Sequence, residues 1–359
     1  MLGRLAPFEV FRQNALNLSN VTRFTTQWPV SKPYHYIDLL FELKVTGGAA
    51  AATGPVADGL LAWIKSINFF TPKNEYIFQN VPGRFAYVIG AESGFDFGAP
   101  RLDVVPNDPG NGSTSSVFGV LIRIPLNDYQ AFDGSDFILD SMGYSNLNFD
   151  VTVGSVSDLY GTPNNVSISS ALLTAVAWQE PVPLVYQTPT ASGGAAAQSK
   201  KAGQVAKWYQ QFFVAGFGDP TSVGFIDLVR SADIAYNNLW FFHGQSASAG
   251  QAFSGATDNI GTRYTDLTLI TDNNIEIKNI LTSLLRDQWQ ARYAGFNANF
   301  KQNSYLGLAF PARGQKQAAL YSGDKSQMRV SWTLPGSGAA SSGSMLSIGA
   351  KVWRRKAAV

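Results

Sequence analysis

The side chains that could carry out chemistry are few in this sequence and stand far apart. His35 and His243 are its only imidazoles and cysteine is absent, which excludes the usual His- or Cys-ligated zinc sites and a cysteine nucleophile. There is no phosphate-binding GxxxxGKS/T loop, no nucleophile elbow and no HExxH pair. We therefore predict a protein that is not an enzyme, with no catalytic residues, no cofactor-binding residues, no metal ligands and no cofactor. Each histidine is expected to be structural.

Carboxylates gather in two segments rich in Gly, Pro and Asn. Asp133, Asp136 and Asp140 form one group, and Asp103 and Asp108 lie in a long connection. Paired carboxylates could hydrolyse glycosides on a β-sandwich, and their oxygens could hold Ca²⁺. Acidic residues in such loops usually form turns by bonding to the backbone, which is the favoured interpretation.

Basic residues near both ends of the chain could face an anionic partner. Apolar positions recur every three or four residues over residues 5–18, which predicts a short amphipathic helix, and the chain closes with VWRRKAAV. A helix packed on its own domain and a solvated tail are the alternatives. The candidates for contact with lipid headgroups or a genome are Arg4, Arg12, Lys351, Arg354, Arg355 and Lys356.

Composition indicates a β protein with much of its surface covered by neighbours. Charged residues make up 14% of the 359 residues, below the usual quarter, while Gly (34), Phe (24) and Tyr (14) are abundant. A net charge of +2 argues against a dominant nucleic-acid or membrane field. We expect no secretory signal peptide and no bilayer-spanning segment. A weakly charged monomeric β protein is the alternative.

Strand signals recur in two sets. Over residues 37–45 apolar side chains alternate with Asp38, Glu42 and Lys44, which is the period of a half-buried strand. The first half has eight candidate strands, at residues 21–28, 37–45, 60–70, 85–89, 117–124, 137–139, 147–153 and 168–178. The second half has eight more, at residues 208–215, 225–229, 235–242, 264–270, 305–310, 318–321, 328–334 and 345–353. Eight is the strand number of a jelly roll.

The stretch PVPLVYQTPTASGGAAAQSKKAG separates the two sets, and its Pro, Gly and Ser residues are typical of a linker. We predict an N-terminal arm at 1–20, a first jelly roll at 21–180, a linker at 181–206, and a second jelly roll with a basic C-terminal tail at 207–359. The predicted fold class is all-β, with two eight-stranded jelly-roll β-sandwiches in tandem and a few short helices. An apolar stripe at helical spacing over 277–293 predicts one of these helices.

Three stretches carry a resemblance to a known family. YIDLLFELKVTGGAAAATGPVADGLLAWIKSINFFTPKNEYIF resembles the first strands of double jelly-roll major capsid proteins of tailless, internal-membrane icosahedral bacteriophages (tectivirus-like, adenovirus-hexon lineage). VLIRIPLNDY is similar to the family's strand that ends in Pro-Leu, and ITDNNIEIKNILTSLLRDQWQARYAG is similar to the helix in its second jelly roll. The resemblance is collinear over about residues 21–355.

The resemblance implies a structural protein of the virion. Three chains would form a homotrimer, a pseudo-hexagonal capsomer that packs with neighbouring capsomers, penton and minor capsid proteins. The resulting icosahedral shell would surround an internal membrane, on the shell's inner face, and a genome, with no specific nucleic-acid recognition. The protein would be made in the host cytoplasm. The alternative is a carbohydrate-binding or glycoside-hydrolysing β-sandwich protein, because a fold alone does not decide function.

Overall fold

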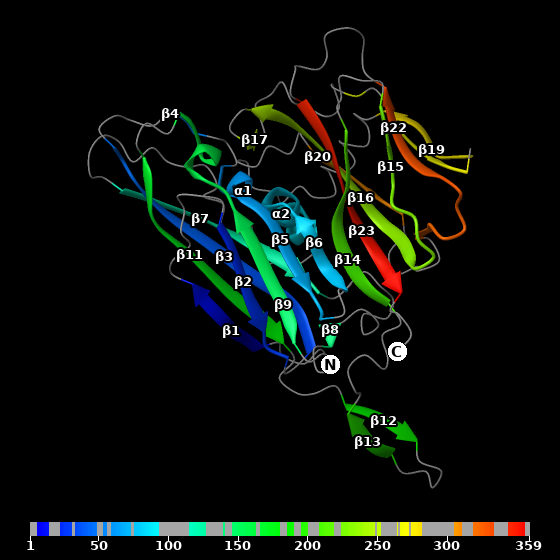
Figure 1. The fold of residues 1–359 in the computed structure, drawn as a ribbon. Helices are drawn as coiled ribbons and strands as arrows, with labels where there is room; N and C mark the ends of the chain where they lie inside the picture. The colour runs from blue at the N-terminus through cyan, green and yellow to red at the C-terminus, as the bar shows by residue number, and fades with distance from the viewer. Residues whose placement is uncertain are drawn as a thin grey trace.

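The fold is dominated by β-strands (Figure 1). A computed structural model describes residues 6–13, 22–30, 33–48, 53–55, 59–72, 75–92, 115–126, 139–140, 146–162, 166–179, 185–189, 195–199, 208–218, 224–247, 250–252, 264, 266–272, 274–281, 305–310, 319–333 and 344–355. The helical elements of these stretches are α1 (Gly59–Trp63), α2 (Gly83–Glu92) and a single 3-10 turn, Val156–Asp158. Neither of the two α-helices is long and apolar enough to cross a membrane.

Two facing sheets form the first sandwich. One contains, in spatial order, β1 (Ala6–Gln13), β11 (Ser167–Gln179), β3 (Pro33–Thr46) and β7 (Ser115–Pro125), with β8 (Leu139–Asp140) beside the start of β3. The other contains β2 (Thr22–Trp28), β9 (Leu147–Val153), β5 (Ile64–Phe70) and β6 (Tyr76–Val81). A short pair, β4 (Thr53–Pro55) and β10 (Tyr160–Thr162), lies apart from both.

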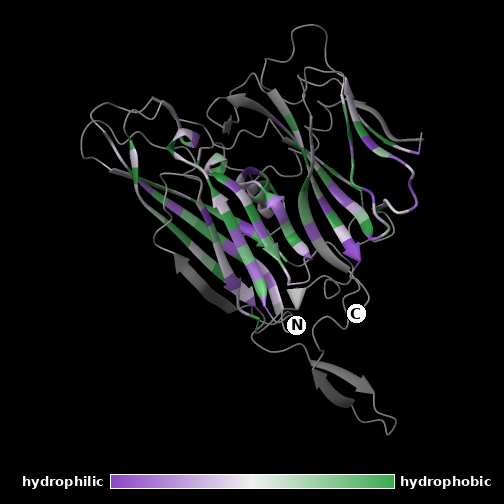
Figure 2. Ribbon diagram, in the orientation of Figure 1, coloured by the Kyte–Doolittle hydropathy of each residue, from purple (hydrophilic) through white to green (hydrophobic). Residues whose placement is uncertain are grey.

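Period-two alternation explains how these sheets pack. Along β3 the side chains of Ile37, Leu39 and Phe41 are fully buried in the core between the sheets, and their neighbours face the other way. Figure 2 shows the same alternation of hydrophobic and hydrophilic residues along several strands. The core is therefore formed by one face of each sheet.

The second sandwich repeats this plan. Its first layer contains β14 (Trp208–Gly218), β23 (Ser344–Arg355) and β16 (Ile234–Ala247), with β17 (Gly250–Ala252), β20 (Tyr305–Ala309) and β21 (Leu320–Tyr321) pairing to β16. The facing layer contains β15 (Phe225–Asp227), β22 (Met328–Thr333), β18 (Asp266–Thr271) and β19 (Asn274–Leu281). Part of the predicted linker forms two strands that pair with each other, β12 (Val185–Pro189) and β13 (Ala195–Ser199).

Most of the expected strands are confirmed, but two segments of the first sandwich that were expected to be strands are helical. Residues 85–89 lie in helix α2, and residues 60–63 lie in helix α1 rather than at the start of a strand. Five consecutive residues of α2, Phe85–Ile89, are buried. A short apolar run that is covered on all sides has no periodicity that distinguishes a helix from a strand.

The two predicted helices are also wrong where the structure describes them. Residues 6–13 form β1, which pairs with the free edge of β11 and so satisfies its backbone groups. Residues 274–281 form β19, which makes a hairpin with β18 through Asp272 at φ 47°. Ile275 and Ile277 also alternate at period two, and β-branched residues favour strands. Residues 282–293 lie outside the described part.

A cluster of polar and aromatic side chains links three strands on the outer face of the first sheet. The Arg123 Nε and Nη2 atoms donate to the two Asp38 carboxylate oxygens at 2.6 and 2.7 Å, and the Trp178 indole donates to Asp38 Oδ2 at 2.8 Å. The Arg123 guanidinium also lies 4.1 Å from the centre of the Tyr36 ring, which stacks on Trp178. The cluster joins β3, β7 and β11, and burial raises the pKa of Tyr36 to about 12.

We expect Gly90→Ala to destabilise the protein by about 1–3 kcal/mol, because α2 lies against β7 at this residue. A Cβ atom there would lie 2.6 Å from the Arg123 carbonyl oxygen. Helix propensity alone would predict that Gly→Ala stabilises the protein by about 0.5–1 kcal/mol. The steric clash and the propensity therefore predict changes in stability of opposite sign. Denaturant unfolding of both proteins measures the difference, and an unchanged or raised stability would contradict the close approach.

Candidate functional site at the junction of the two sandwiches

The two sandwiches are built on one continuous sheet of ten strands. They join where β6 pairs in parallel with β14, with Phe78 opposite Phe212 and Gln79 opposite Phe213. Phe78 and Phe212 belong to the first core, whereas Phe213 packs against the second. Because neighbouring residues of a strand face opposite sides, the two cores lie on opposite faces of the shared sheet.

An aromatic row crosses the junction on the side of the first core. The ring centres of Phe78 and Phe212 lie 5.1 Å apart, and Phe212 stacks on Trp240 of β16 at 6.1 Å. The row therefore connects β6 of the first sandwich with β14 and β16 of the second. Aromatic pairs at these separations stabilise by about 0.5–1.5 kcal/mol beyond their area burial.

Helix α2 of the first half of the chain packs on strands of the second half. Phe85 meets Phe242 of β16 edge-to-face at 5.9 Å, and the buried Arg84 guanidinium lies 5.7 Å from the centre of the same ring. A Cβ atom at Gly349 of β23 would lie 3.0 Å from the Phe85 ring, so the glycine leaves room for it. In Figure 1 this helix lies between the two sandwiches. It therefore links the two sandwiches through Phe85 and Arg84, and we call it the wedge helix.

A polar chain crosses the junction on the side of the second core. Gln211 is 1% exposed, and its Nε2 donates to Gln79 Oε1 at 2.9 Å while its Oε1 accepts from Arg354 Nη1 at 3.0 Å. Arg354 Nε in turn donates to Asp233 Oδ2 at 2.8 Å. Burial would raise the pKa of Asp233, but hydrogen bonds from Ser231 and Arg354 outweigh it and lower this pKa.

We expect Asp233→Asn to lower the free energy of unfolding at pH 7 by at most about 1 kcal/mol, since the pair is partly exposed. A carboxyl group whose pKa is lower in the folded protein than in the unfolded chain stabilises the folded state at pH values above its unfolded pKa, about 3.9. That stabilisation is lost as the pH falls through the folded-state pKa. The deficit should therefore shrink below about pH 4. Urea unfolding at pH 7 and pH 3 measures it, with the exposed Asp324→Asn as control. A deficit at pH 3 as large as that at pH 7 would speak against the ion pair.

The described basic residues among those predicted to face an anionic partner lie on two strands, β23 and β1. Lys351 lies in β23, within the strand expected at 345–353, and is 8% exposed. Arg354 also belongs to β23 and forms the polar chain above. Arg355 ends β23 and is exposed. Arg12 lies in β1 opposite Thr174, and Arg4 and Lys356 fall outside the described residues. Of the described residues in this set, three lie on β23 and Arg12 lies on β1, a strand of the other sandwich.

Within the described part of the chain, the histidines and carboxylates considered for chemistry do not form a site. His243 is fully buried, with its Nδ1 3.0 Å from the Tyr264 hydroxyl, and His35 is 3% exposed. Within the described stretches no three His, Asp or Glu side chains are grouped to hold a metal ion. Asp103, Asp108, Asp133 and Asp136 lie outside those stretches.

Comparison with solved structures identifies the architecture. No family model and no curated protein matches the sequence. The STIV MCP, from Sulfolobus turreted icosahedral virus, superposes with a TM-score of 0.63 over 97% of both chains at 14% identity. The major capsid protein P2 of bacteriophage PM2 gives 0.51 at 9% identity, over 97% of this chain and 98% of that one. PBCV-1 VP54 gives 0.56 at 9% identity, over 98% and 94%. The chain thus has the double jelly-roll fold of these proteins.

Proposed function

We propose that this double jelly-roll chain is a structural major capsid protein and has no catalytic activity. The observation that carries the proposal is the fold likeness to viral capsid chains over nearly the whole of both chains. The junction supports it, because one sheet, one aromatic row and one wedge helix make the two sandwiches a single block. A rigid block with two similar lobes is what a shell unit requires.

The proposed assembly is a homotrimer in which three blocks give six sandwiches and a pseudo-hexagonal outline. Closed symmetry buries large interfaces without new sequence, and lateral packing covers exposed sheet edges. These capsomers would pack with their neighbours and with penton and minor capsid proteins into an icosahedral shell around an internal membrane and genome. The protein would be made in the host cytoplasm and would recognise no particular nucleic-acid sequence.

The same proposal includes the domain division expected from the sequence. We place the first jelly roll at residues 21–180 and the second at 207–359, with an arm at 1–20 and a linker at 181–206. Strand β1 pairs with β11 at one edge of the first sandwich, and β23 lies between β14 and β16 in the second. Arg4, Arg12, Arg355 and Lys356 stay candidates for the face turned toward the interior of the shell.

Light scattering of the purified chain tests the proposal. We expect the mass of a trimer at micromolar concentration, and electron microscopy should show hexagonal particles or shells. A stable monomer with neither trimers nor shells across salt and pH conditions would contradict the capsid role.

A further inference from the structure

One end of the second sandwich combines features that its other described surfaces lack. This end, called here the basal surface, is formed by residues 225–233, the turn at 321–327 and the last residues of β23. Backbone hydrogen bonds hold these parts together: Leu228 donates to Met328 at 2.9 Å, and Arg355 donates to Asp233 at 2.8 Å. The surface therefore has a fixed shape on the edge of the sandwich.

Large exposed apolar side chains concentrate at the basal surface. The described stretches expose four such residues, and three of them, Phe225 (53%), Val229 (50%) and Tyr321 (40%), lie here. The fourth, Val117 (52%), is near the start of β7 on the first sandwich. An apolar group gathered on one surface and rimmed by polar residues is typical of an interaction site.

Positive charge without a carboxylate partner lies beside these apolar residues. Arg329 pairs with Asp227, and Arg354 pairs with Asp233. Arg230 instead donates to the Lys325 carbonyl oxygen at 2.8 Å, which leaves its other N–H groups for a ligand. Among the described residues neither Arg230 nor the exposed Arg355 forms an ion pair. Together with Lys325 they outnumber the exposed Asp324 of the same surface, so the basal surface carries a net positive charge that attracts anions.

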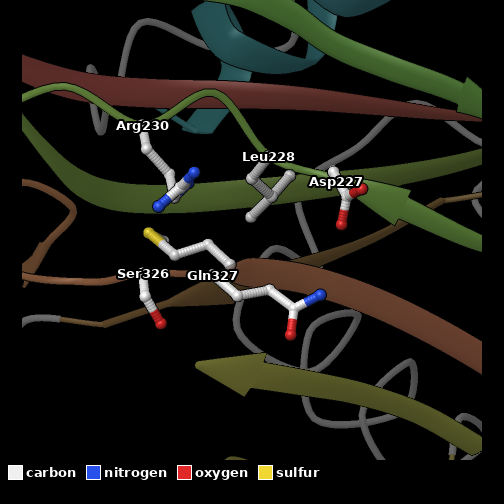
Figure 3. A pocket seen from close by; sticks show the side chains of 6 residues that line it. Asp227, Leu228, Arg230, Ser326 and Gln327 are labelled. Atoms are coloured by element: carbon white, nitrogen blue, oxygen red, sulfur yellow. The ribbon is translucent and has the colours of Figure 1, made fainter. Parts of the chain in front are cut away.

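An open pocket of about 460 Å³ lies between these groups. Figure 3 shows Arg230 and Ser326 at one end of it and Asp227 and Gln327 at the other, with Leu228 between them. Ser326 already donates its hydroxyl hydrogen to Asp272 at 2.6 Å, which fixes that side of the pocket. The Arg230 end can donate to a phosphate, and Asp227 and Gln327 can accept from hydroxyl groups.

We propose that the basal surface binds a bilayer that contains anionic phospholipid, with a phosphate on Arg230 and headgroup hydroxyls on Asp227 and Gln327. Val229 and Tyr321 would then lie among the headgroups, where aromatic and aliphatic side chains next to basic residues are favourable. A nucleic acid offers the same phosphates but leaves half-exposed Val229 without an apolar contact. Binding to the bilayer does not depend on the proposed shell role. That role is needed only to say that the basal surface would face the inside of a shell.

Vesicle flotation of the full chain tests the proposal, with vesicles of phosphatidylglycerol and phosphatidylcholine compared with phosphatidylcholine alone. We expect binding to the anionic vesicles that weakens as salt rises. Arg230→Gln should lower the partition coefficient about fivefold, since each basic residue near an anionic surface contributes on the order of 1 kcal/mol. Lys44→Gln, an equal charge loss at an exposed residue of β3, is the matched control and should leave binding unchanged.

The apolar part of the proposal has its own pair of variants. Val229→Ser should weaken binding at least about threefold, because it removes apolar area that the membrane buries. Val117→Ser changes an equally exposed valine on the first sandwich and should have no effect. Equal losses in the test and control variants, or binding to duplex DNA in preference to vesicles, would overturn the proposal. Vesicle binding that fails while trimers and shells still form would overturn this inference alone and leave the capsid role intact.

Discussion

Replacing Phe85 with alanine is expected to lower the free energy of unfolding by about 3–5 kcal/mol and to split one unfolding transition into two. Phe85 is buried in α2, where it contacts Phe242 and fills the space that Gly349 leaves. Its removal leaves a cavity between elements from the two halves of the chain. The second sandwich can then unfold at a lower denaturant concentration than the first, because one of the contacts that couple them is lost while the shared sheet and the aromatic row remain.

Denaturant unfolding followed by tryptophan fluorescence and by circular dichroism, at one fixed protein concentration, measures this effect. Phe118→Ala is the matched control, since Phe118 is equally buried but lies in β7 within the first core. It should cost a similar free energy. It should not create a transition in which the second sandwich unfolds first. A Phe85→Ala protein with a single transition and a loss below about 1 kcal/mol would refute the wedge role.

Asp38→Ala is expected to destabilise the protein by about 3–5 kcal/mol. Asp38 is 8% exposed and accepts three hydrogen bonds, two from Arg123 and one from the Trp178 indole. Without the carboxylate, the Arg123 guanidinium remains largely buried with no opposite charge from this residue. Breaking one side of a buried ion pair costs much more than an exposed pair contributes.

Urea unfolding at pH 7 compares Asp38→Ala with Lys44→Ala, an exposed change on the same strand and the same face of the sheet. The lysine variant should stay within about 0.5 kcal/mol of the unmodified protein. Asp38→Asn should fall between the two, because an amide oxygen still accepts from Trp178 but carries no charge. Equal free energies of unfolding for Asp38→Ala, Asp38→Asn and Lys44→Ala would show that the cluster around Asp38 does not stabilise the sheet.

The alternation of apolar and polar residues was sufficient to predict the strands that have one buried and one solvent-exposed face. In β3 and β9 the apolar residues alternate strictly enough to give both the element and its buried side. The same logic failed for α2, which is buried on all sides, and for β1 and β19, where strand pairing outweighed an apparent helical stripe. Helix propensity over eight residues is weak beside the backbone groups that an open sheet edge can satisfy.

The junction could not be predicted from pattern. It depends on which residue of β6 lies opposite Phe212, and that register is set by contacts between segments far apart in the chain. Arg354 was assigned to a basic tail, and Lys351 to an anionic partner, for a related reason. Charge in the sequence does not reveal that Arg354 is held by Gln211 and Asp233, or that Lys351 lies on a buried stretch of β23.

The parallel contact of β6 with β14 also bears on how the polypeptide is synthesised. During translation β6 emerges long before β14, and at ribosome speeds of about 5–20 residues per second the interval is roughly 6–25 s. Until β14 arrives, the edge of β6 that it will cover is unpaired, and another nascent chain could occupy it. A polysome that makes many copies side by side is therefore where this protein is most exposed to mispairing, and slower elongation between the two halves would prolong the hazard.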